Sequence, residues 1–202
     1  MSAPHSPLRV GHVLFPGFEL LDVYGPLEML GLLGERATIS MLAEEAGAVT
    51  SHAGPKAVAE ATLAEAGDFD VLLIPGGQGT RREVENTRLL GLLRELSARS
   101  RIVATVCTGS ALLARTGLLD GVRATSNKLA WDWVIAQGPK VNWVRRARWV
   151  EDGKYFTSSG ISAGIDMSLA LIARELGRET ARNIAGRAEY LWNEASENDP
   201  FA

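Results

Sequence analysis

Hydrophobic positions in this sequence fall into short continuous runs and longer stretches with helical spacing. The runs LRVGHVLF (8–15), FDVLLIPGG (69–77) and RIVATV (101–106) have the length of strands and few polar positions. Continuous apolar runs are typical of strands that are buried on both faces of a sheet. The stretches ELLDVYGPLEMLGLLG (19–34) and TRLLGLLRELSARS (87–100) space their apolar residues as amphipathic helices do. Strand and helix therefore alternate in the first half of the chain.

The second half continues this alternation. GSALLARTGLL (109–119) and KLAWDWVIAQG (128–138) predict two short helices, each closed by a glycine. VNWVRRARWVEDGKYFTSS (141–159) predicts two strands joined by the EDG turn. SAGIDMSLALIAREL (162–176) and RETARNIAGRAEYLW (178–192) predict two further helices, and the first of them is apolar nearly all round and therefore buried.

Two stretches depart from the simple pattern. Pro26 interrupts the stretch 19–34, and because proline is disfavoured inside a helix we expect a fresh helix to begin there. The three pieces ATISMLAE (37–44), AVTSHAG (48–54) and KAVAEAT (56–62) are short, strand-like and separated by glycine. We expect them to form a side excursion.

The whole pattern predicts an α/β fold with a mostly parallel central sheet and helices on both faces. A length of 202 residues suits a single domain spanning 1–202, whose residues 1–7 form a polar, proline-bearing tail. The charged fraction of 22% and the hydrophobic fraction of 46% are ordinary for a globular protein.

Charge and cysteine content narrow the function classes. The net charge of -3 provides no basic field for nucleic acid, and the basic cluster VRRARWV (144–150) predicts a solvated strand edge. A single cysteine cannot form an internal disulfide, and the N-terminal apolar run is too short for a signal peptide. We therefore expect a cytoplasmic protein without a nucleic-acid or membrane partner.

The single cysteine, Cys107, lies between the strand RIVATV and the helix GSALLA. Ligands of open α/β sheets bind beyond the carboxyl ends of the strands, and Cys107 falls at that edge. The free N–H groups of the first helical turn favour a thiolate, and the small residues Gly109, Ser110 and Ala111 allow a sharp turn of the nucleophile-elbow kind. The competing interpretation is a buried cysteine that acts as a small hydrophobic residue.

Two glycines follow another central strand in the motif IPGGQG (74–79). Gly76 and Gly77 are expected at the same sheet edge, where glycine lets backbone N–H groups approach a ligand closely. The amides of Gly77 and Thr108 would then form an oxyanion-type donor pair for an intermediate attached to the sulfur. An ordinary Pro-Gly turn is the competing interpretation.

Carboxylates and histidines decide how such a cysteine is activated. Asp22 follows the first strand and is a candidate proton carrier, although Glu19 is a nearby rival and a helix cap is an equally simple role for Asp22. The histidines, His5, His12 and His52, all precede Cys107 and have no metal-ligand spacing. We therefore expect no metal and no cofactor.

Four motifs in order resemble the ThiJ/PfpI superfamily, the single-domain relatives of class I glutamine amidotransferases. They are LFPGFELLDVYGPLEML (14–30), FDVLLIPGGQGT (69–80), VATVCTGSALLARTGLLDGVRAT (103–125) and SSGISAGIDMSLALIA (158–173). Within the superfamily they look most like isonitrile hydratases and the ligand-binding domains of AraC-type regulators. The resemblance implies a flavodoxin-like sandwich that is commonly a homodimer and acts on a small-molecule substrate.

The resemblance also implies roles for particular residues. Cys107 matches the nucleophile of the hydratases, Asp22 the carboxylate beside it, Thr108 the following residue and Gly77 the oxyanion glycine, next to Gly76. It implies a reaction in which the thiolate attacks an isonitrile, and water then releases an N-substituted formamide.

One segment departs from the pattern of the relatives. Where many of them carry a histidine, this chain reads SNKLAWDWV, with Asn127 and Lys128. A Cys–His protease or amidase is therefore disfavoured. We take Asn127 as a further candidate for oxyanion or substrate binding, beside Gly76 and Gly77. The nearby Trp131 and Trp133 either shape a different pocket or belong to the core of a helix.

Two other functions stay open: glyoxalase or deglycase chemistry on 2-oxoaldehydes, and a non-enzymatic redox or ligand sensor.

Overall fold

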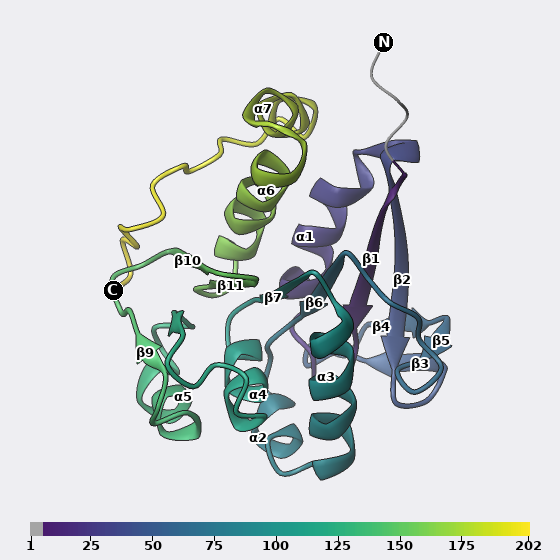
Figure 1. Cartoon of the computed structure of the whole chain (residues 1–202), viewed down its shortest axis with the longest axis vertical. Helices are drawn as coiled ribbons and strands as arrows, with labels where there is room; N and C mark the ends of the chain where they lie inside the picture. Colours follow the sequence, from purple (N-terminus) through teal and green to yellow (C-terminus); the bar gives the residue numbers. More distant parts are fainter. Residues whose placement is uncertain (1–5) are drawn as a thin grey trace.

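The computed structural model describes residues 6–202 and is built around a seven-stranded sheet with the order β10-β11-β7-β6-β1-β2-β5 (Figure 1). Neighbouring strands pair in parallel except β10 and β11, which form the antiparallel hairpin that the EDG turn predicts. The predicted mostly parallel sheet is thus confirmed. Its strands are β1 (Leu8–Val13), β2 (Ala37–Ala43), β5 (Ala61–Thr62), β6 (Val71–Ile74), β7 (Ile102–Thr105), β10 (Trp149–Asp152) and β11 (Tyr155–Ser158).

Helices cover both faces of this sheet, as the sequence pattern predicts (Figure 1). Alternate residues of the central strands point into two separate clusters of buried side chains, so that Leu72 and Ile74 face one layer while Val71 and Leu73 face the other. One layer holds α1 (Leu20–Gly31), α6 (Ala163–Leu176) and α7 (Arg178–Arg187). The other holds α2 (Thr80–Glu83), α3 (Thr87–Arg99), α4 (Gly109–Arg115) and α5 (Trp131–Gln137).

The predicted helix break at Pro26 is wrong, because α1 runs through the proline without interruption. Tertiary packing explains this. A Cβ on Gly25 would lie 2.8 Å from Cγ1 of Ile165, and a Cβ on Gly164 would lie 3.5 Å from Cγ of Pro26. The two glycines let α1 and α6 approach closely, and that contact holds the helix together despite the N–H that proline lacks.

The side excursion predicted for residues 37–62 is only partly correct. β2 belongs to the main sheet and pairs with β1 along six residues, from Leu8↔Ala37 to Val13↔Leu42. β3 (Gly47–Thr50) and β4 (Lys56–Ala59) do leave the sheet as a separate antiparallel pair, before β5 returns to the sheet edge. β2 resembles the pieces after it because most of its residues are only partly buried.

The basic cluster at 144–150 is not simply a solvated strand edge. Arg145 and Arg146 are exposed, but Arg148 is 6% exposed and forms an ion pair with Asp166 of α6. An arginine can be buried here because an oppositely charged partner accompanies it. Nearby, β8 (Arg123–Ala124) and β9 (Asn142–Trp143) form a further small parallel pair.

The last fifteen residues do not continue as a helix. The helix predicted for 178–192 ends at Arg187, and the chain then runs irregularly past the edge strand β10 (Figure 1). The N–H of Arg148 donates to the carbonyl of Ser196 at 2.7 Å, and the N–H of Asp199 donates to the carbonyl of Arg146 at 2.7 Å. We call residues 188–202 the C-terminal segment. No helix in the described part of the chain is long and apolar enough to cross a membrane.

Candidate functional site

Cys107 lies in the turn between β7 and α4 with a φ of 56°, a backbone conformation that residues other than glycine rarely adopt. Its N–H donates to the carbonyl of Ser158 at 3.2 Å. Its carbonyl accepts hydrogen bonds from the hydroxyls of Ser126 at 2.8 Å and Ser110 at 3.1 Å. Such strain, on the order of 1–3 kcal/mol, persists only where the surroundings hold the residue in place. These three serines provide that hold at the predicted strand-to-helix position.

Asp22 is fully buried in the first turn of α1 and does not cap the helix. Its Oδ2 instead accepts a hydrogen bond from the N–H of Gly76 at 2.9 Å. Among the described residues no geometrically well-placed donor reaches its other oxygen, Oδ1. Burial raises the pKa of Asp22 from 3.8 to about 8, against the opposing effects of the Gly76 N–H and the facing Cys107 thiol. Glu19, the rival candidate, raises this pKa further through its charge.

The thiol of Cys107 is not held as a thiolate, contrary to the expectation from the helix start. Burial raises its pKa well above the ordinary value, and the charge of Asp22 raises it further. The Thr108 amide, the Asn127 side chain and the Thr108 hydroxyl oppose this shift as hydrogen-bond partners. A short helix of seven residues does not compensate for removing the sulfur from water. Asp22 and Cys107 therefore form a coupled pair of acids in which ionisation of one opposes ionisation of the other.

Gly76 and Gly77 reach the same edge as Cys107, as predicted. A Cβ on Gly76 would lie 2.6 Å from the Thr108 nitrogen and 2.9 Å from Oδ2 of Asp22, so only glycine fits between them. The amide of Gly77, expected to face an oxyanion, donates instead to the Thr108 hydroxyl at 3.1 Å. That hydroxyl also accepts a hydrogen bond from Thr80 at 3.1 Å. A substrate oxygen or nitrogen would have to displace the Thr108 hydroxyl to use the Gly77 amide.

Asn127 closes the other side of the sulfur. Its Oδ1 accepts a hydrogen bond from the N–H of Ala130 at 2.9 Å, which leaves the Nδ2 group as a donor. A Cβ on Gly160 would meet both this Nδ2 and the Cys107 Sγ, the latter at 2.7 Å. Gly160 is therefore a site residue that the sequence reasoning missed, although it lies inside the motif SSGISAGID. Its role depends on contacts with residues far away in the sequence.

Arg81 is the second residue that the sequence reasoning missed. Its guanidinium lies 4.2 Å from the ring centroid of Trp133 and donates to the Thr80 hydroxyl at 3.2 Å. Its charge is close enough to interact with that of Cys107. Trp131, by contrast, is 7% exposed and packs edge-on against Trp143, so it belongs to the core. Of the two tryptophans that were left open, only Trp133 lies beside the site.

The two histidines of the described chain, His12 and His52, are not among the groups that shift the pKa of Cys107. His12 is buried in β1, where burial lowers its pKa to about 4, and His52 lies between β3 and β4. Neither acts on the pKa of the thiol. His5 lies outside the described residues. In the described part of the chain, no cluster of three or more histidine, cysteine or acidic residues is arranged to hold a metal ion.

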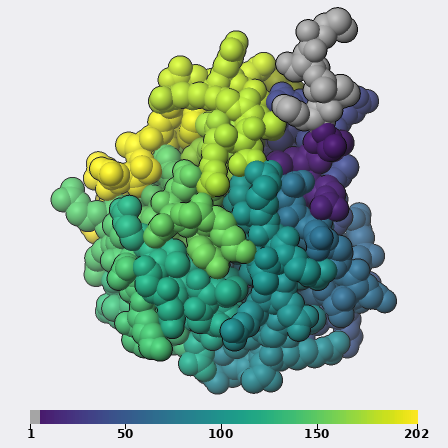
Figure 2. Space-filling view, in the orientation of Figure 1, coloured from purple at the N-terminus to yellow at the C-terminus, as the bar shows by residue number. Residues whose placement is uncertain are grey.

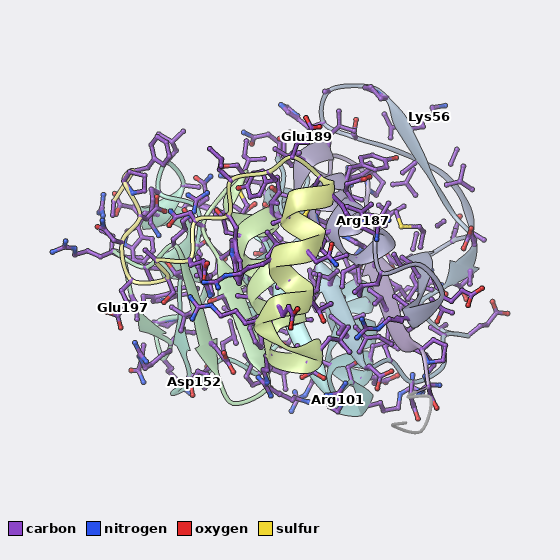
Figure 3. All side chains as sticks on the ribbon, turned by 90° about the horizontal axis from the view of Figure 1, so that it is seen from above. Lys56, Arg101, Asp152, Arg187, Glu189 and Glu197 are labelled. Atoms are coloured by element: carbon purple, nitrogen blue, oxygen red, sulfur yellow. The ribbon has the colours of Figure 1, made fainter. Side chains whose placement is uncertain are left out.

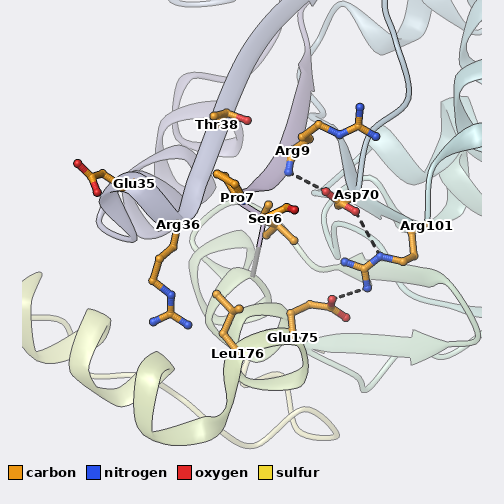
Figure 4. A pocket seen from close by; sticks show the side chains of 11 residues that line it. Ser6, Pro7, Arg9, Glu35, Arg36, Thr38, Asp70, Arg101, Glu175 and Leu176 are labelled. Atoms are coloured by element: carbon orange, nitrogen blue, oxygen red, sulfur yellow. Dashed lines mark hydrogen bonds and ion pairs between the residues drawn. The ribbon is translucent and has the colours of Figure 1, made fainter. Parts of the chain in front are cut away.

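A broad cavity of about 990 Å³ lies at the opposite edge of the sheet (Figure 4). Arg9, Asp70 and Arg101, which line it, lie at or just before the starts of β1, β6 and β7, whereas Cys107 follows the end of β7. An ion pair joins Arg101 to Asp70, and another joins Arg101 to Glu175. None of the predicted site residues lines this cavity.

Comparison with known proteins identifies the family and the fold of this chain. The sequence profile of the DJ-1/PfpI family matches residues 9–174. The chain is 34% identical over 183 residues to the isonitrile hydratase of Pseudomonas putida, a match that covers 91% of this chain and 78% of that enzyme. It is 31% identical over 188 residues to the transcriptional regulator GbdR of Pseudomonas aeruginosa. That match covers 89% of this chain but only 50% of the regulator.

Solved structures show the same fold. A THiJ/PfpI family protein from Pseudomonas syringae superposes with a TM-score of 0.84 at 31% identity, covering 91% of this chain and 75% of that one. A DJ-1 superfamily protein from Salmonella typhimurium gives a TM-score of 0.80 at 27% identity, covering 92% of this chain and all of that one.

Proposed function

The chain belongs to the DJ-1/PfpI family, and we propose that it is a cysteine-dependent hydratase that converts isonitriles to N-substituted formamides. The observation that carries this proposal is the buried pair of Cys107 and Asp22, in which a thiol faces a carboxyl group whose pKa is raised to about 8. The similarity to an isonitrile hydratase over most of both chains supports the choice of substrate class.

The first step of the proposed reaction joins the sulfur to the isonitrile carbon. In the ionised form of the pair, the Asp22 carboxylate takes the thiol proton while the sulfur attacks the terminal carbon. The same carboxyl then delivers the proton to that carbon, which leaves a thioimidate on Cys107. The pKa of Asp22 lies close to neutral pH, where a single group can both accept and return a proton.

The second step adds water and releases the product. Asp22, again a carboxylate, removes a proton from water as the oxygen attacks the thioimidate carbon. Asp22 passes this proton to the imine nitrogen, which gives a tetrahedral intermediate with an N–H and a hydroxyl group. The intermediate then collapses as the C–S bond breaks, and the proton of its hydroxyl group goes through Asp22 to the departing sulfur. The products are the N-substituted formamide and free Cys107, so one isonitrile and one water are consumed in each cycle.

The surrounding donors would stabilise charge as it develops. The Thr108 amide and the Asn127 side chain lie near enough to the sulfur to lower the pKa of Cys107, in opposition to burial. The Gly77 amide becomes available if the Thr108 hydroxyl turns away, and it would then serve the oxyanion role expected for it. Gly76 takes part by holding Asp22, because its N–H binds the Oδ2 oxygen.

We further propose that the active form is a homodimer. The first helix presents Leu21 and Tyr24, each 41% exposed, and Ile161 beside Gly160 has the same exposure. These apolar side chains flank Asp22 and Gly160, so a second copy packed on them would exclude water from the site. Size-exclusion chromatography with light scattering tests this, and a monomer at micromolar concentration would contradict it.

The decisive assay incubates the purified, reduced protein with a cyclohexyl or an aryl isonitrile and quantifies the formamide. Turnover is expected for the wild type and not for Cys107→Ser, whose hydroxyl is a far weaker nucleophile. No turnover across a varied isonitrile panel, with the thiol shown to be reduced, would overturn the proposal.

The same assay decides between the alternatives. Conversion of methylglyoxal to lactate that is lost in Cys107→Ser would favour 2-oxoaldehyde chemistry instead. Inactivity toward both classes would favour a sensor role, for which the similarity to part of a transcriptional regulator gives specific support.

A further inference from the structure

A buried cluster of charged residues lies next to the candidate site and has no part in the proposed chemistry. It consists of Lys128, Arg148, Asp166 and Asp199, whose side chains are between 0% and 7% exposed. Arg148 pairs with Asp166 at 2.6 Å, Lys128 faces Asp199 at 3.6 Å, and Arg148 lies 3.9 Å from Asp199. Burying four charges is costly unless each is paired, so the cluster is expected to serve a purpose.

Lys128 is the member of the cluster that forms hydrogen bonds with the residues around Asn127. Its ammonium group donates to the Thr125 hydroxyl at 2.8 Å, to the Ser126 carbonyl at 3.1 Å and to the Ala147 carbonyl at 2.8 Å. We call residues 125–130 the Asn127 loop. One buried cation therefore ties two residues of this loop to the chain that leads into β10.

Asp199 brings the C-terminal segment into the same arrangement. This segment lies on the surface against the residues that precede β10, and Glu189 and Glu197 mark its course (Figures 2 and 3). Backbone hydrogen bonds hold it there, including that from the N–H of Asp199 to the Arg146 carbonyl. In the described chain, Oδ2 of Asp199 is buried without a hydrogen-bond partner, and it lies 3.6 Å from the ammonium group of Lys128. The segment thus supplies the counter-charge for Lys128.

The Asn127 loop in turn contacts the reactive cysteine in two ways. The Ser126 hydroxyl binds the Cys107 carbonyl at 2.8 Å, and the Asn127 Nδ2 group lies against the sulfur above Gly160. We propose that Lys128, paired with Asp199, is a positioning residue that holds the Asn127 amide toward the Cys107 sulfur. The loop has no regular secondary structure between Thr125 and Lys128, so these contacts fix its shape.

Lys128 and Asp199 would thus assist the proposed hydratase without touching the substrate. This role in catalysis rests on the proposed function, whereas the positioning of Asn127 is tested separately by the pKa of the Cys107 thiol. Because the Asn127 side chain favours the thiolate as a donor, a displaced Asn127 raises the pKa of Cys107. A hydratase whose Lys128 is removed would therefore lose kcat more than it changes KM.

The experiment titrates Cys107 by the ultraviolet absorbance of its thiolate, with Cys107→Ser as the blank. Asn127→Ala sets the reference, with an expected fall in the thiolate-to-thiol ratio of about three- to tenfold at a given pH. Lys128→Met is expected to reproduce at least half of that shift on the logarithmic scale, and Asp199→Asn a smaller part of it. Lys128→Arg, which keeps the charge, is expected to restore part of the ratio.

Lys154 provides a matched control. Its ammonium group also donates to two backbone carbonyls, those of Ser97 at 2.6 Å and Ser100 at 3.3 Å. Lys154, however, lies just before the start of β11, at the edge of the sheet opposite to Cys107. Lys154→Met is expected to lower the Tm without altering the titration of Cys107.

Stability and positioning are separated by the double variant. If Lys128→Met does not fold because Asp199 is left unpaired, Lys128→Met with Asp199→Asn removes both charges and is titrated in its place. A wild-type titration curve in a folded Lys128 variant, beside a shifted curve in Asn127→Ala, would overturn the inference. An inactive wild type with shifted titration curves would overturn only the proposed function.

Discussion

The two edges of the central sheet differ in almost every physical respect. At the carboxyl edge, Cys107 and Asp22 are buried, their pKa values are raised, and the backbone at Cys107 is strained. At the amino edge, a cavity of about 990 Å³ is lined by charged residues such as Asp70 and Arg101, which pair with each other in contact with solvent. The edge with the broad cavity thus carries partly exposed ion pairs, whereas the raised pKa values and the strained backbone lie at the other edge.

Burial, and not cavity size, distinguishes the edge of the sheet that carries Cys107 and Asp22. Removing a carboxyl and a thiol from water raises the free energy of their charged forms and therefore raises the pKa of both groups. The partly exposed ion pairs of the amino edge are screened by water. Both edges belong to the same parallel strands, and only the carboxyl edge receives the turns that follow them.

The largest expected effect is on activity, and it is measured by replacing one aspartate with asparagine at each edge of the sheet. Asp22→Asn removes the proposed proton carrier and is expected to lower kcat/KM with an isonitrile by about 10²- to 10⁴-fold. Asp70→Asn, the same change at the amino edge, is expected to leave kcat/KM within about twofold, because a screened surface pair contributes little. Steady-state formamide production measures both. Equal losses in the two variants would remove the distinction between the edges.

The next effect is on stability and depends on pH. The pKa of Asp22 is about 8 in the folded protein against an ordinary 3.8, so the folded state binds more protons between these values. The free energy of unfolding of the protein therefore falls as pH rises from 4 to 8. Asp22 contributes on the order of a few kcal/mol to this fall. Asp22→Asn lacks this loss, so its Tm relative to the wild type is expected to rise across that range.

His12 sets the control for that measurement. Its pKa is lowered from 6.5 to about 4, so the unfolded state binds more protons between these values and stability falls as pH drops through them. Both proteins share this effect, and it cancels in their difference. A Tm difference that stays constant from pH 4 to 8 would contradict the assigned pKa of Asp22.

A smaller effect is expected from adding one methyl group at each of two glycines. Gly76→Ala places a Cβ against the Thr108 nitrogen and Asp22, and it is expected to cost about 1–3 kcal/mol and most of the activity. Gly91→Ala in α3 meets nothing within 4 Å and is expected to stabilise the protein by roughly 0.5–1 kcal/mol. Chemical denaturation measures both, and a tolerated Gly76→Ala would show that this edge is less tightly packed than described.

The smallest effect is expected at the amino edge. Arg101→Ala breaks its pairs with Asp70 and Glu175, and these pairs involve an arginine whose side chain is half exposed. The expected loss is at most about 1 kcal/mol, and less at high salt, because water and ions screen such pairs. Denaturation at low and high salt measures it, and a loss of several kcal/mol would mean that this edge is also a tightly coupled site.

The sequence pattern predicted the frame of the molecule well, for a physical reason. Strands β6 and β7 are buried on both faces, so their continuous apolar runs are distinctive, and the position of Cys107 follows from the end of β7. Asp22 was correctly placed at the same edge because the turn after β1 leads there. These features depend on neighbours in the sequence and on the rule for parallel sheets.

What could not be predicted depends on residues far apart in the sequence. The helix through Pro26 relies on Gly164, the burial of Arg148 relies on Asp166, and the contact of Gly160 with Cys107 relies on the return of β11. The protonated thiol was missed for a similar reason, because burial is a property of the assembled fold and outweighs the short helix that follows. The pattern of neighbouring residues in the sequence reveals neither these long-range contacts nor the burial of the thiol.

The central claim, that Asp22 and Cys107 act as one coupled pair of acids, is tested most directly by titrating the thiolate absorbance in the wild type and in Asp22→Asn. Because the charge of Asp22 opposes ionisation of the sulfur, the pKa of Cys107 is expected to fall when that charge is removed. Identical titration curves for the two proteins would show that the carboxyl and the thiol do not interact, and would contradict the account.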